Sequence, residues 1–392
     1  MNSRTQKLLR EYHKAYDCNP DCLVKAPGRV DLMGNHTDYN DGFVLPVALD
    51  VDIMAAGRLR NDRIIRLIST DIPGESSFSL DNITKDILSP WTNYVRGIAK
   101  YLQESGYTLQ GADIAVSSTV PIGSGLSSSA ALEMSTGFLM QSLCSIDVPP
   151  VDLALIGQKA ENKFVGVNTG IMDQFISRLG KLDHALYIDC RTFEYSHVPL
   201  DSTKVTIVIC DTKKRRGLVG SEYDTRREQC NNAVTLLSKR LPGIKALRDV
   251  DINFLQANID CLPDIVAKRA EHVVRENQRV IDGCKLLSSG EYEGFGALMD
   301  ESHASARDLY QVSCLELDAM VTVSAAVKGV LGSRLAGAGF GGCTVSLVLP
   351  EAVSEFLEIV PIEYKKITGI VPAVYVCNAA DGASLVENWQ SE

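Results

Sequence analysis

The chain has 392 residues, of which 45% are hydrophobic and 22% charged, and its net charge is −10. This length exceeds the size at which a single hydrophobic core usually stops growing, so we expect two domains. The sequence contains no apolar run of about eighteen residues, which excludes a membrane-spanning helix. The acidic balance argues against nonspecific binding to nucleic acids.

The N-terminal segment is polar and lacks the apolar core of a secretory signal, so we interpret it as an amphipathic surface helix. Eleven cysteines are scattered along the chain, mostly among apolar residues. Their odd number and their surroundings are typical of reduced thiols in a reducing compartment. We therefore expect a cytoplasmic monomer that has no nucleic-acid or membrane partner.

The first half of the chain alternates between segments with strand patterns and segments with helix patterns. We expect strands at 43–56, 64–69, 112–119, 184–189 and 205–211. We expect helices at 91–104, 126–143 and 151–164.

The second half is more helical, with helices expected at 221–239, 265–287 and 315–328. In the middle one, apolar residues recur every three or four positions and predict one buried face: Ile265, Val266, Ala270, Val273, Val274, Val280, Ile281 and Cys284. A final strand is expected after the glycine-rich stretch 337–342. The fold class is therefore α/β to α+β with mixed sheets, and we expect domains at 1–200 and 201–392.

A glycine- and serine-rich loop, VPIGSGLSSSAA at 120–131, lies between an expected strand and an expected helix. Its glycines allow backbone N–H groups to turn toward a phosphate, and the helix N-terminus adds partial positive charge. The loop lacks the lysine of a Walker A motif. A serine-rich helix cap is the alternative. We interpret the loop as an ATP-binding site made by Gly123, Ser124, Gly125, Leu126, Ser127, Ser128 and Ser129.

Two further segments have unusual compositions. Residues 26–46, APGRVDLMGNHTDYNDGFVLP, hold one Arg, one His and several acids in what we interpret as a short loop. Such a density of donors and acceptors suits a hydroxyl-rich ligand, although a polar turn is the alternative. Residues 334–345, RLAGAGFGGCTV, contain four glycines before a strand, which indicates close backbone approach to a ligand or another loop.

In this order and spacing, the three segments resemble the three motifs of the GHMP kinases. The first motif is similar to that of the galactokinase family, as are GIMDQFIS at 170–177, RRGLVGSEYDTRREQC at 215–230 and DESHASARDLYQVSC at 300–314. The resemblance implies a two-domain GHMP-kinase-like fold with its active site in the cleft between the domains. It also implies that ATP and Mg²⁺ are used to phosphorylate the C1 hydroxyl of galactose.

The resemblance also implies roles for individual residues. Asp173 would be the base that accepts the proton of the anomeric hydroxyl, and Arg29 would pair with it, although a purely structural Asp–Arg pair is the alternative. Ser129 and Glu161 would bind Mg²⁺. The sugar would be bound by Asn35, His36, Asp38, the backbone of Gly170, and Tyr223. Trp91 and Tyr94 occupy the stretch expected to contact adenine, with a core position as the alternative for Trp91.

Two positions depart from the family pattern. Galactokinases carry Glu where this chain has Asn35, and Asn where it has Asp31. That Glu accepts a hydrogen bond from the C6 hydroxyl, whereas Asn can also donate. Arabinokinases of the family are similar at both positions. Galactose is therefore the first expectation, with L-arabinose or galacturonate, or a non-catalytic galactose and ATP sensor, as alternatives.

Overall fold

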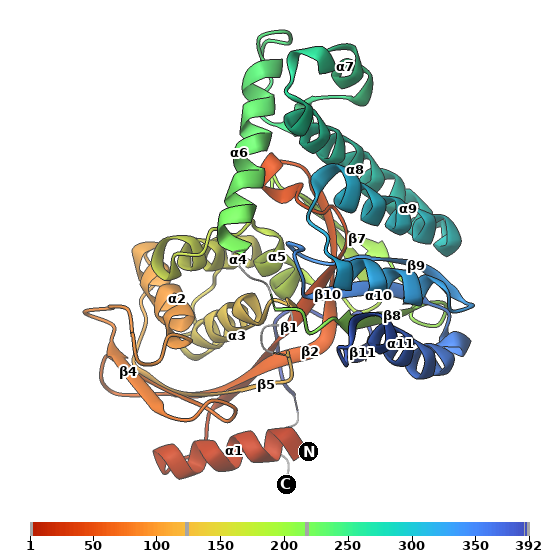
Figure 1. The fold of residues 1–392 in the computed structure, drawn as a ribbon. Helices are drawn as coiled ribbons and strands as arrows, with labels where there is room; N and C mark the ends of the chain where they lie inside the picture. The colour runs from red at the N-terminus through yellow and green to blue at the C-terminus, as the bar shows by residue number, and fades with distance from the viewer. Residues whose placement is uncertain (1–2, 122–124, 216–218, 388, 390–392) are drawn as a thin grey trace.

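The computed structural model describes residues 3–121, 125–215, 219–387 and 389, which form two β-sheets with helices around them (Figure 1). The larger sheet has the strand order β12-β1-β2-β5-β3-β4, with β6 paired to β2 and β7 paired to β6. The smaller sheet has the order β11-β8-β10-β9. The pairing of β3 with β5 is parallel and the other pairs are antiparallel. The expected mixed α/β architecture is confirmed.

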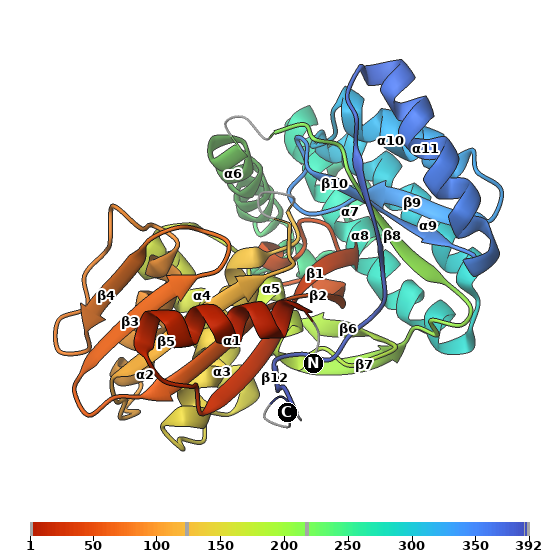
Figure 2. The same cartoon turned by 90° about the horizontal axis from the view of Figure 1, so that it is seen from below.

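The strands of the larger sheet are β1 (Cys22–Met33), β2 (Phe43–Leu59), β3 (Ile64–Ser69), β4 (Glu75–Ser79), β5 (Ala112–Ser118), β6 (His184–Asp189), β7 (Tyr195–Pro199) and β12 (Ser384–Leu385). Helix α1 (Ser3–Tyr16) lies against one face of this sheet. The other face carries α2 (Thr92–Glu104), α3 (Ser128–Leu143), α4 (Pro150–Lys159) and α5 (Met172–Leu179) (Figure 1). Viewed from below, α1 lies across the strands of the larger sheet (Figure 2).

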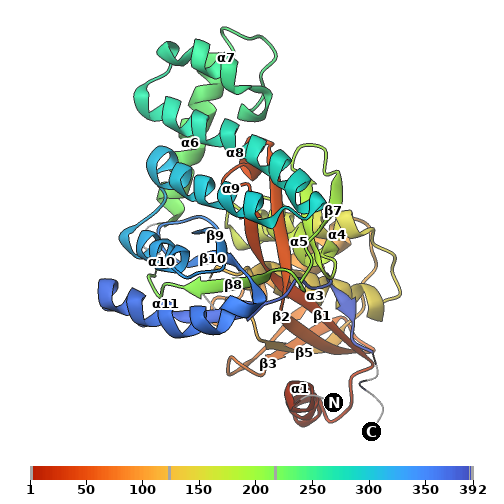
Figure 3. The ribbon, with the colours of Figure 1, turned by 90° about the vertical axis from the view of Figure 1, so that its right-hand side faces the viewer.

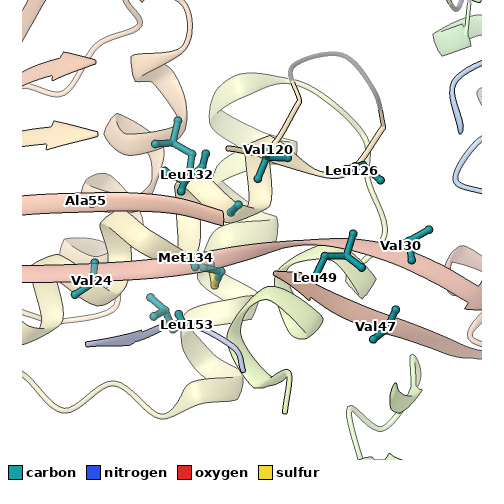
Figure 4. Packing of buried hydrophobic residues seen from close by; sticks show 14 of the residues in the cluster. Val24, Val30, Val47, Leu49, Ala55, Val120, Leu126, Leu132, Met134 and Leu153 are labelled. Atoms are coloured by element: carbon teal, nitrogen blue, oxygen red, sulfur yellow. The ribbon is translucent and has the colours of Figure 1, made fainter. Parts of the chain in front are cut away.

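The main core fills the space between this sheet and its inner helices (Figure 4). Val24 and Val30 of β1 and Leu49 of β2 belong to the same buried cluster as Met134 of α3 and Leu153 of α4. Because these side chains exclude water, they fix α3 and its preceding loop against β1. The backbone N–H of Arg29 also donates to the carbonyl of Leu126 at 3.1 Å.

The smaller sheet lies between two helical layers (Figure 3). Its strands are β8 (Thr206–Asp211), β9 (Val330–Leu335), β10 (Cys343–Val348) and β11 (Ala373–Cys377). Along β8, Ile207 and Ile209 join the main core beside α8 (Asp264–Ser289) and α9 (Tyr292–Ser305). Val208 and Cys210 point the other way, toward α10 (Leu315–Ala325) and α11 (Val353–Thr368). Because both faces of the strand are covered, the four residues 207–210 are all apolar.

Further helices extend from this half of the molecule. Helix α6 (Val219–Leu237) packs on α8, and the short α7 (Ile252–Ala257) lies at the far end of both (Figures 1 and 3). Two π-helical turns, at Ala160–Val165 and Ala306–Tyr310, continue α4 and α9. Short 3₁₀ turns occupy Asp38–Asn40, Leu247–Asp249, Ile259–Cys261 and Pro350–Ala352. No helix in the described ranges is long and apolar enough to cross a membrane.

The expected elements are found within a few residues of their predicted bounds, with two corrections. Residues 22–33 form strand β1, so Arg29 and Asp31 lie on a strand and not in a loop. The segment was predicted as a loop because the regular pattern of the strand is broken there, at the register shift between Pro27 and Arg29. In the long helix α8, the expected face is largely buried, but Ile265 is 39% exposed.

The predicted domain boundary at residue 200 falls between β7 and β8, where the chain passes from one sheet to the other. The last strand, β12, returns to the larger sheet and pairs with β1, and both chain ends lie at the same side of the molecule (Figures 1 and 2). The C-terminal segment therefore bridges the two halves. The boundary itself stays a prediction.

Candidate active site

A cavity of about 600 Å³ lies between the two halves of the chain. Its wall combines β1 and the loops that follow α4 and β1 with residues of α6 and of the glycine-rich stretch before β10. Eight of the predicted site residues line it: Arg29, Asn35, His36, Asp38, Gly125, Gly170, Asp173 and Tyr223. Asn168, Thr169 and Asp224, which were not among the predicted site residues, also line it. So do Gly337 and Ala338, which belong to the glycine-rich stretch for which the sequence predicted close backbone approach to a ligand or another loop.

Arg29 and Asp173 form a two-pronged ion pair in this wall. The Nε and Nη2 atoms of Arg29 donate to the two carboxylate oxygens of Asp173 at 2.7 and 2.6 Å. The third guanidinium nitrogen, Nη1, donates to the carbonyl of Gly125 at 2.8 Å. Arg29 thus joins β1, the first turn of α5 and the phosphate loop. Such bidentate pairs are geometrically specific as well as strong.

The described part of the phosphate loop contains two residues in the left-handed backbone region. Gly125 and Ser127 both have positive φ, at 87° and 56°. The hydroxyl of Ser127 donates to Oδ2 of Asp173 and makes no capping bond to α3, which begins at Ser128. This contact argues against a simple helix cap at Ser127. Gly123 and Ser124 lie outside the described residues.

Glu161 lies deep beside the loop, on the π-helical turn Ala160–Val165. Its Oε2 accepts from the hydroxyl of Thr169 at 3.0 Å and from Nε2 of Gln174 at 2.8 Å. Ser129 is also among its hydrogen-bond partners. Burial, followed by the charge of Asp173, raises the pKa of Glu161 above its ordinary value. The structure therefore brings the two predicted metal ligands together.

Glu133 on α3 is a fully buried neighbour that the sequence did not single out. Its Oε2 accepts from Nε2 of Gln174 at 3.0 Å, and its Oε1 is buried without a hydrogen bond. Burial and the charge of Glu161 raise the pKa of Glu133 well above its ordinary value. The sequence analysis missed Glu133 because a single buried acid on a mostly apolar helix does not change the pattern of hydrophobic residues.

These residues fit a hard divalent cation that keeps most of its own water or nucleotide ligands. The described residues include no group of three or more His, Cys, Asp or Glu side chains that could enclose a metal. Glu161 and Ser129 nevertheless offer two neighbouring oxygen ligands. The charges of Glu161 and Asp173 both act on the nearby Glu133, so this region is negative. Mg²⁺ typically binds proteins through one or two such oxygens.

In the same cavity wall, Asp38 lies directly against the backbone of Gly170. A Cβ atom at position 170 would come within 1.7 Å of Oδ2 of Asp38, so only glycine fits there. Burial raises the pKa of Asp38 to about 6, and the charges of Asp173 and Asp31 add to this shift. Two predicted sugar-binding positions are therefore adjacent.

His36 belongs to an aromatic cluster with Tyr39, Tyr223 and Tyr310. Its Nε2 lies 3.2 Å from the carbonyl of Ala338, and its Nδ1 lies 2.8 Å from the hydroxyl of Tyr39. Because a carbonyl only accepts, Nε2 carries the proton and Nδ1 accepts from Tyr39. Burial lowers the pKa of His36 to about 3, so the ring is neutral.

The two positions that depart from the family pattern connect the first and third motifs. Nδ2 of Asn35 donates to the carbonyl of Gly337 at 2.7 Å, while its Oδ1 is buried without a donor. Oδ1 of Asp31 accepts from the backbone N–H of Gly337 at 2.8 Å, and Oδ2 lies 3.2 Å from Nη1 of Arg334. Both side chains thus hold the glycine-rich stretch against β1.

Glu276 of α8 supports the same region and was missed by the sequence analysis. Its Oε1 accepts from the backbone N–H groups of Gly34 and Asn35, both at 3.0 Å. Its Oε2 accepts from Nε of Arg279 at 2.7 Å. Burial opposes ionisation, but Arg279 and Arg334 hold the pKa of Glu276 well below its ordinary range. Arg269, His272, Glu276 and Arg279 recur at helical spacing, so a buried polar stripe was the available signal.

Trp91 and Tyr94 are half-buried at the start of α2 and pack against the main core. Neither lines the cavity. Burial raises the pKa of Tyr94 to about 12, and the charges of Glu161 and Glu133 contribute. Tyr94 is therefore near the predicted metal ligands, and contact of either residue with adenine stays a prediction.

Three family models and several known proteins match the chain. Residues 10–59 match the galactokinase galactose-binding signature, residues 93–181 the GHMP kinases N terminal domain, and residues 285–366 the GHMP kinases C terminal domain. Galactokinase from Roseiflexus sp. (strain RS-1) is 47% identical over 382 residues, covering 97% of each chain. Galactokinase from Chloroflexus aggregans is 47% identical over 379 residues, again with 97% coverage of each.

Solved structures show the same relationship. The structure of Lactococcus lactis galactokinase complexed with galactose matches with a TM-score of 0.93 at 35% identity, covering 97% of this chain and 99% of that one. Methanococcus jannaschii mevalonate kinase matches with a TM-score of 0.63 at 20% identity, covering 92% of this chain and 98% of that one, which shows a shared fold. The chain therefore belongs to the galactokinase family of GHMP kinases, which are ATP-dependent phosphotransferases acting on a sugar hydroxyl.

Proposed function

We propose that this chain transfers the γ-phosphoryl group of MgATP to the C1 hydroxyl of galactose and releases galactose 1-phosphate and ADP. The observation that carries the proposal is the Arg29–Asp173 pair, which lies in the cavity wall and contacts the phosphate loop through Gly125 and Ser127. The galactokinase relatives and the galactose complex of the Lactococcus lactis enzyme support this choice of sugar.

Asp173 retains room for one more hydrogen bond. An ionised carboxylate offers about four lone-pair directions. Arg29 uses one on each oxygen, and Ser127 uses a second on Oδ2. The remaining direction on Oδ1 is available to the C1 hydroxyl, which would pass its proton to Asp173 as its oxygen bonds to phosphorus and the bond to ADP breaks. Arg29 would offset charge on the transferring group, so positioning and charge neutralisation supply most of the catalysis.

The ATP phosphates would lie over the loop at 123–129, and Ser129 with Glu161 would bind the accompanying Mg²⁺. The cation would supply charge neutralisation of the phosphates. The adjacency of Glu161 and Ser129 supports this assignment. Trp91 and Tyr94 would border the adenine side.

The sugar would occupy the part of the cavity lined by Asn35, His36, Asp38, Gly170 and Tyr223. Asp38 can accept from ring hydroxyls, since its carboxylate faces the backbone of Gly170 at the wall. Both ring nitrogens of His36 are already bound, so in this arrangement it would shape the wall. Asn35 is a neutral residue at the position implied to face C6, and its Nδ2 already contacts Gly337.

The remaining expectations concern the setting of the enzyme. Five of the eleven cysteines are buried, as expected of thiols used as small core residues, which supports the proposal of a reducing, cytoplasmic location. We also propose that the protein acts as a monomer on small molecules, without nucleic-acid or membrane partners.

The decisive experiment is a coupled ADP-release assay on the purified chain with galactose, 2-deoxygalactose, galactosamine, galacturonate, L-arabinose and N-acetylgalactosamine. We expect the highest kcat/KM with galactose. A higher kcat/KM with L-arabinose or galacturonate would overturn galactose as the substrate. ADP release with none of the sugars, in a protein that still binds ATP, would favour a sensor.

A further inference from the structure

The glutamine that follows the proposed base connects two buried acids. Gln174 is fully buried on the first turn of α5, next to Asp173. Its Nε2 lies 2.8 Å from Oε2 of Glu161 and 3.0 Å from Oε2 of Glu133. A primary amide nitrogen carries two hydrogens, so one can be directed to each carboxyl group.

These contacts leave one oxygen of Glu161 for another partner. Its Oε2 receives Gln174 and also the hydroxyl of Thr169 at 3.0 Å. An oxygen that accepts two hydrogen bonds cannot rotate without breaking both. These two hydrogen bonds fix the orientation of the carboxylate and leave Oε1 available to a cation.

The packing around the pair is specific. Gly157 of α4 faces it, and a Cβ atom there would come within 3.0 Å of Cγ of Gln174 and 2.6 Å of Cε of Met134. Glu133 is fully buried, and its carboxyl group accepts a hydrogen bond from Gln174. Its position is explained by its contact with Gln174.

We propose that Gln174 and Glu133 are positioning residues that orient Glu161 for Mg²⁺ and couple it to the helix that carries Asp173. This inference rests on the proposed function, in which Glu161 binds the cation. Glu133 holds the Gln174 amide, Gln174 holds Oε2 of Glu161, and the same helix turn presents Asp173. A shift of the metal ligand would therefore be transmitted to the base through two adjacent residues.

The test is Mn²⁺ binding to the protein in the presence of ADP, measured by electron paramagnetic resonance, together with galactose binding by calorimetry. Gln174→Leu removes both donors, and we expect a rise in the Mn²⁺ Kd of about tenfold or more. The galactose Kd should stay within about twofold. Glu133→Leu should raise the Mn²⁺ Kd in the same direction by a smaller factor. Glu133→Gln retains an acceptor for Gln174 and should restore most of the affinity.

Thr136→Val is a matched control on α3. Thr136 is fully buried and its hydroxyl bonds only to the carbonyls of its own helix, so its loss disturbs packing without reaching Glu161. Equal Mn²⁺ affinities for wild type, Gln174→Leu and Glu133→Leu would overturn the inference, as would an equal loss in Thr136→Val. If Gln174→Leu does not fold, the contrast between Glu133→Leu and Glu133→Gln decides.

A further variant separates this inference from the proposed function. Glu161→Ala should itself lose Mn²⁺ affinity. If it does not, the metal assignment fails, whatever Gln174 does. If Glu161→Ala loses affinity and Gln174→Leu does not, only the positioning role fails.

Discussion

Two groups of buried charges flank the cavity, and they are neutralised in different ways. In the sugar-side cluster (Asp31, Glu276, Arg279 and Arg334), two carboxylates meet two guanidinium groups. In the metal-side cluster (Glu133, Glu161, Asp173 and Arg29), three carboxyl groups share one guanidinium, which is bound to Asp173.

The pKa values respond accordingly. Arginine charges hold the pKa of Glu276 well below its ordinary range, although the side chain is fully buried. The pKa values of Glu133 and Glu161 are raised, because burial and neighbouring acids both oppose their ionisation. A buried carboxyl group paired with arginine stays ionised, whereas one without a cationic partner tends to keep a proton, which a bound cation would replace. We infer that the sugar side is pre-organised and that the metal side is completed only when nucleotide and cation bind.

Breaking the sugar-side cluster should have the largest effect on stability. Glu276→Leu leaves Arg279 and two backbone N–H groups without their acceptor, and removing one partner of a buried ion pair costs about 3–5 kcal/mol. We expect a lower free energy of unfolding in urea and a lower Tm. Asp282→Ala, which breaks an exposed pair with Lys285 on the same helix, is the control and should change stability by less than about 1 kcal/mol.

The same residue predicts the direction of the pH dependence. The folded pKa of Glu276 is lower than its unfolded value, so its stabilisation is complete above that unfolded value, at about pH 5. It is lost as the pH falls toward the folded pKa. Wild type should therefore lose more stability than Glu276→Gln between about pH 5 and pH 3. Parallel losses for the two proteins would contradict the ionised state of Glu276.

Asp173→Asn removes the carboxylate that pairs with Arg29 in the metal-side cluster and that is proposed to accept the proton of the sugar. We expect kcat to fall on the order of 10²-fold or more, because the base and the charge partner of Arg29 are lost together. Nucleotide binding and folding should be nearly unchanged, as measured by ADP calorimetry and thermal melting. Turnover equal to wild type would remove Asp173 from the mechanism.

The metal side should respond to cation concentration when its proposed ligands are removed. Ser129→Ala and Glu161→Ala each delete one oxygen ligand, so each should raise the Mg²⁺ concentration for half-maximal rate about tenfold. Thr169→Val keeps both ligands but loses a hydrogen bond to Glu161, and should lie between these variants and wild type. Wild-type Mg²⁺ titration curves for both alanine variants would show that the ligand assignment is wrong.

Hydrophobic periodicity predicted most of the strands and helices, and the glycine-rich motifs pointed to a phosphate loop, because these are local signals. The proposed sugar-binding residues, along with Asp173 and Glu161, were implied by the family resemblance, and Glu161 and Ser129 are not part of the cavity lining. Strand β1 was interpreted as a loop because Pro27 and Gly28 interrupt its alternation.

Glu133 and Glu276 were missed for a different reason. The helices that carry them were predicted from their apolar residues alone, and Gln174 and the backbone of Gly34, which bond to them, are tens to hundreds of residues away in sequence. Buried polar contacts of this kind depend on the tertiary fold.

The smallest expected effect concerns Asn35, which contacts Gly337 and occupies the position that the family resemblance implies to face C6 of the sugar. Glutamate is one methylene longer than asparagine, so Asn35→Glu would bring a carboxylate toward the group implied to lie at C6. A hydrogen bond to a charged group contributes about 1.5–3 kcal/mol, and the lost contact with Gly337 costs about 1 kcal/mol.

The lost contact with Gly337 affects both sugars alike, so the new hydrogen bond alone should raise kcat/KM for galactose relative to L-arabinose, which has no C6 hydroxyl, by roughly tenfold or more. The kcat/KM for galacturonate should fall, because the new carboxylate would face the like charge of the galacturonate carboxylate. Asp38→Ala provides the contrast, since it should impair every sugar that shares the ring hydroxyls. An unchanged ranking of sugars in Asn35→Glu would mean that position 35 only ties Gly337 to β1. The departure from the family pattern would then concern the architecture of the sugar side and not its specificity.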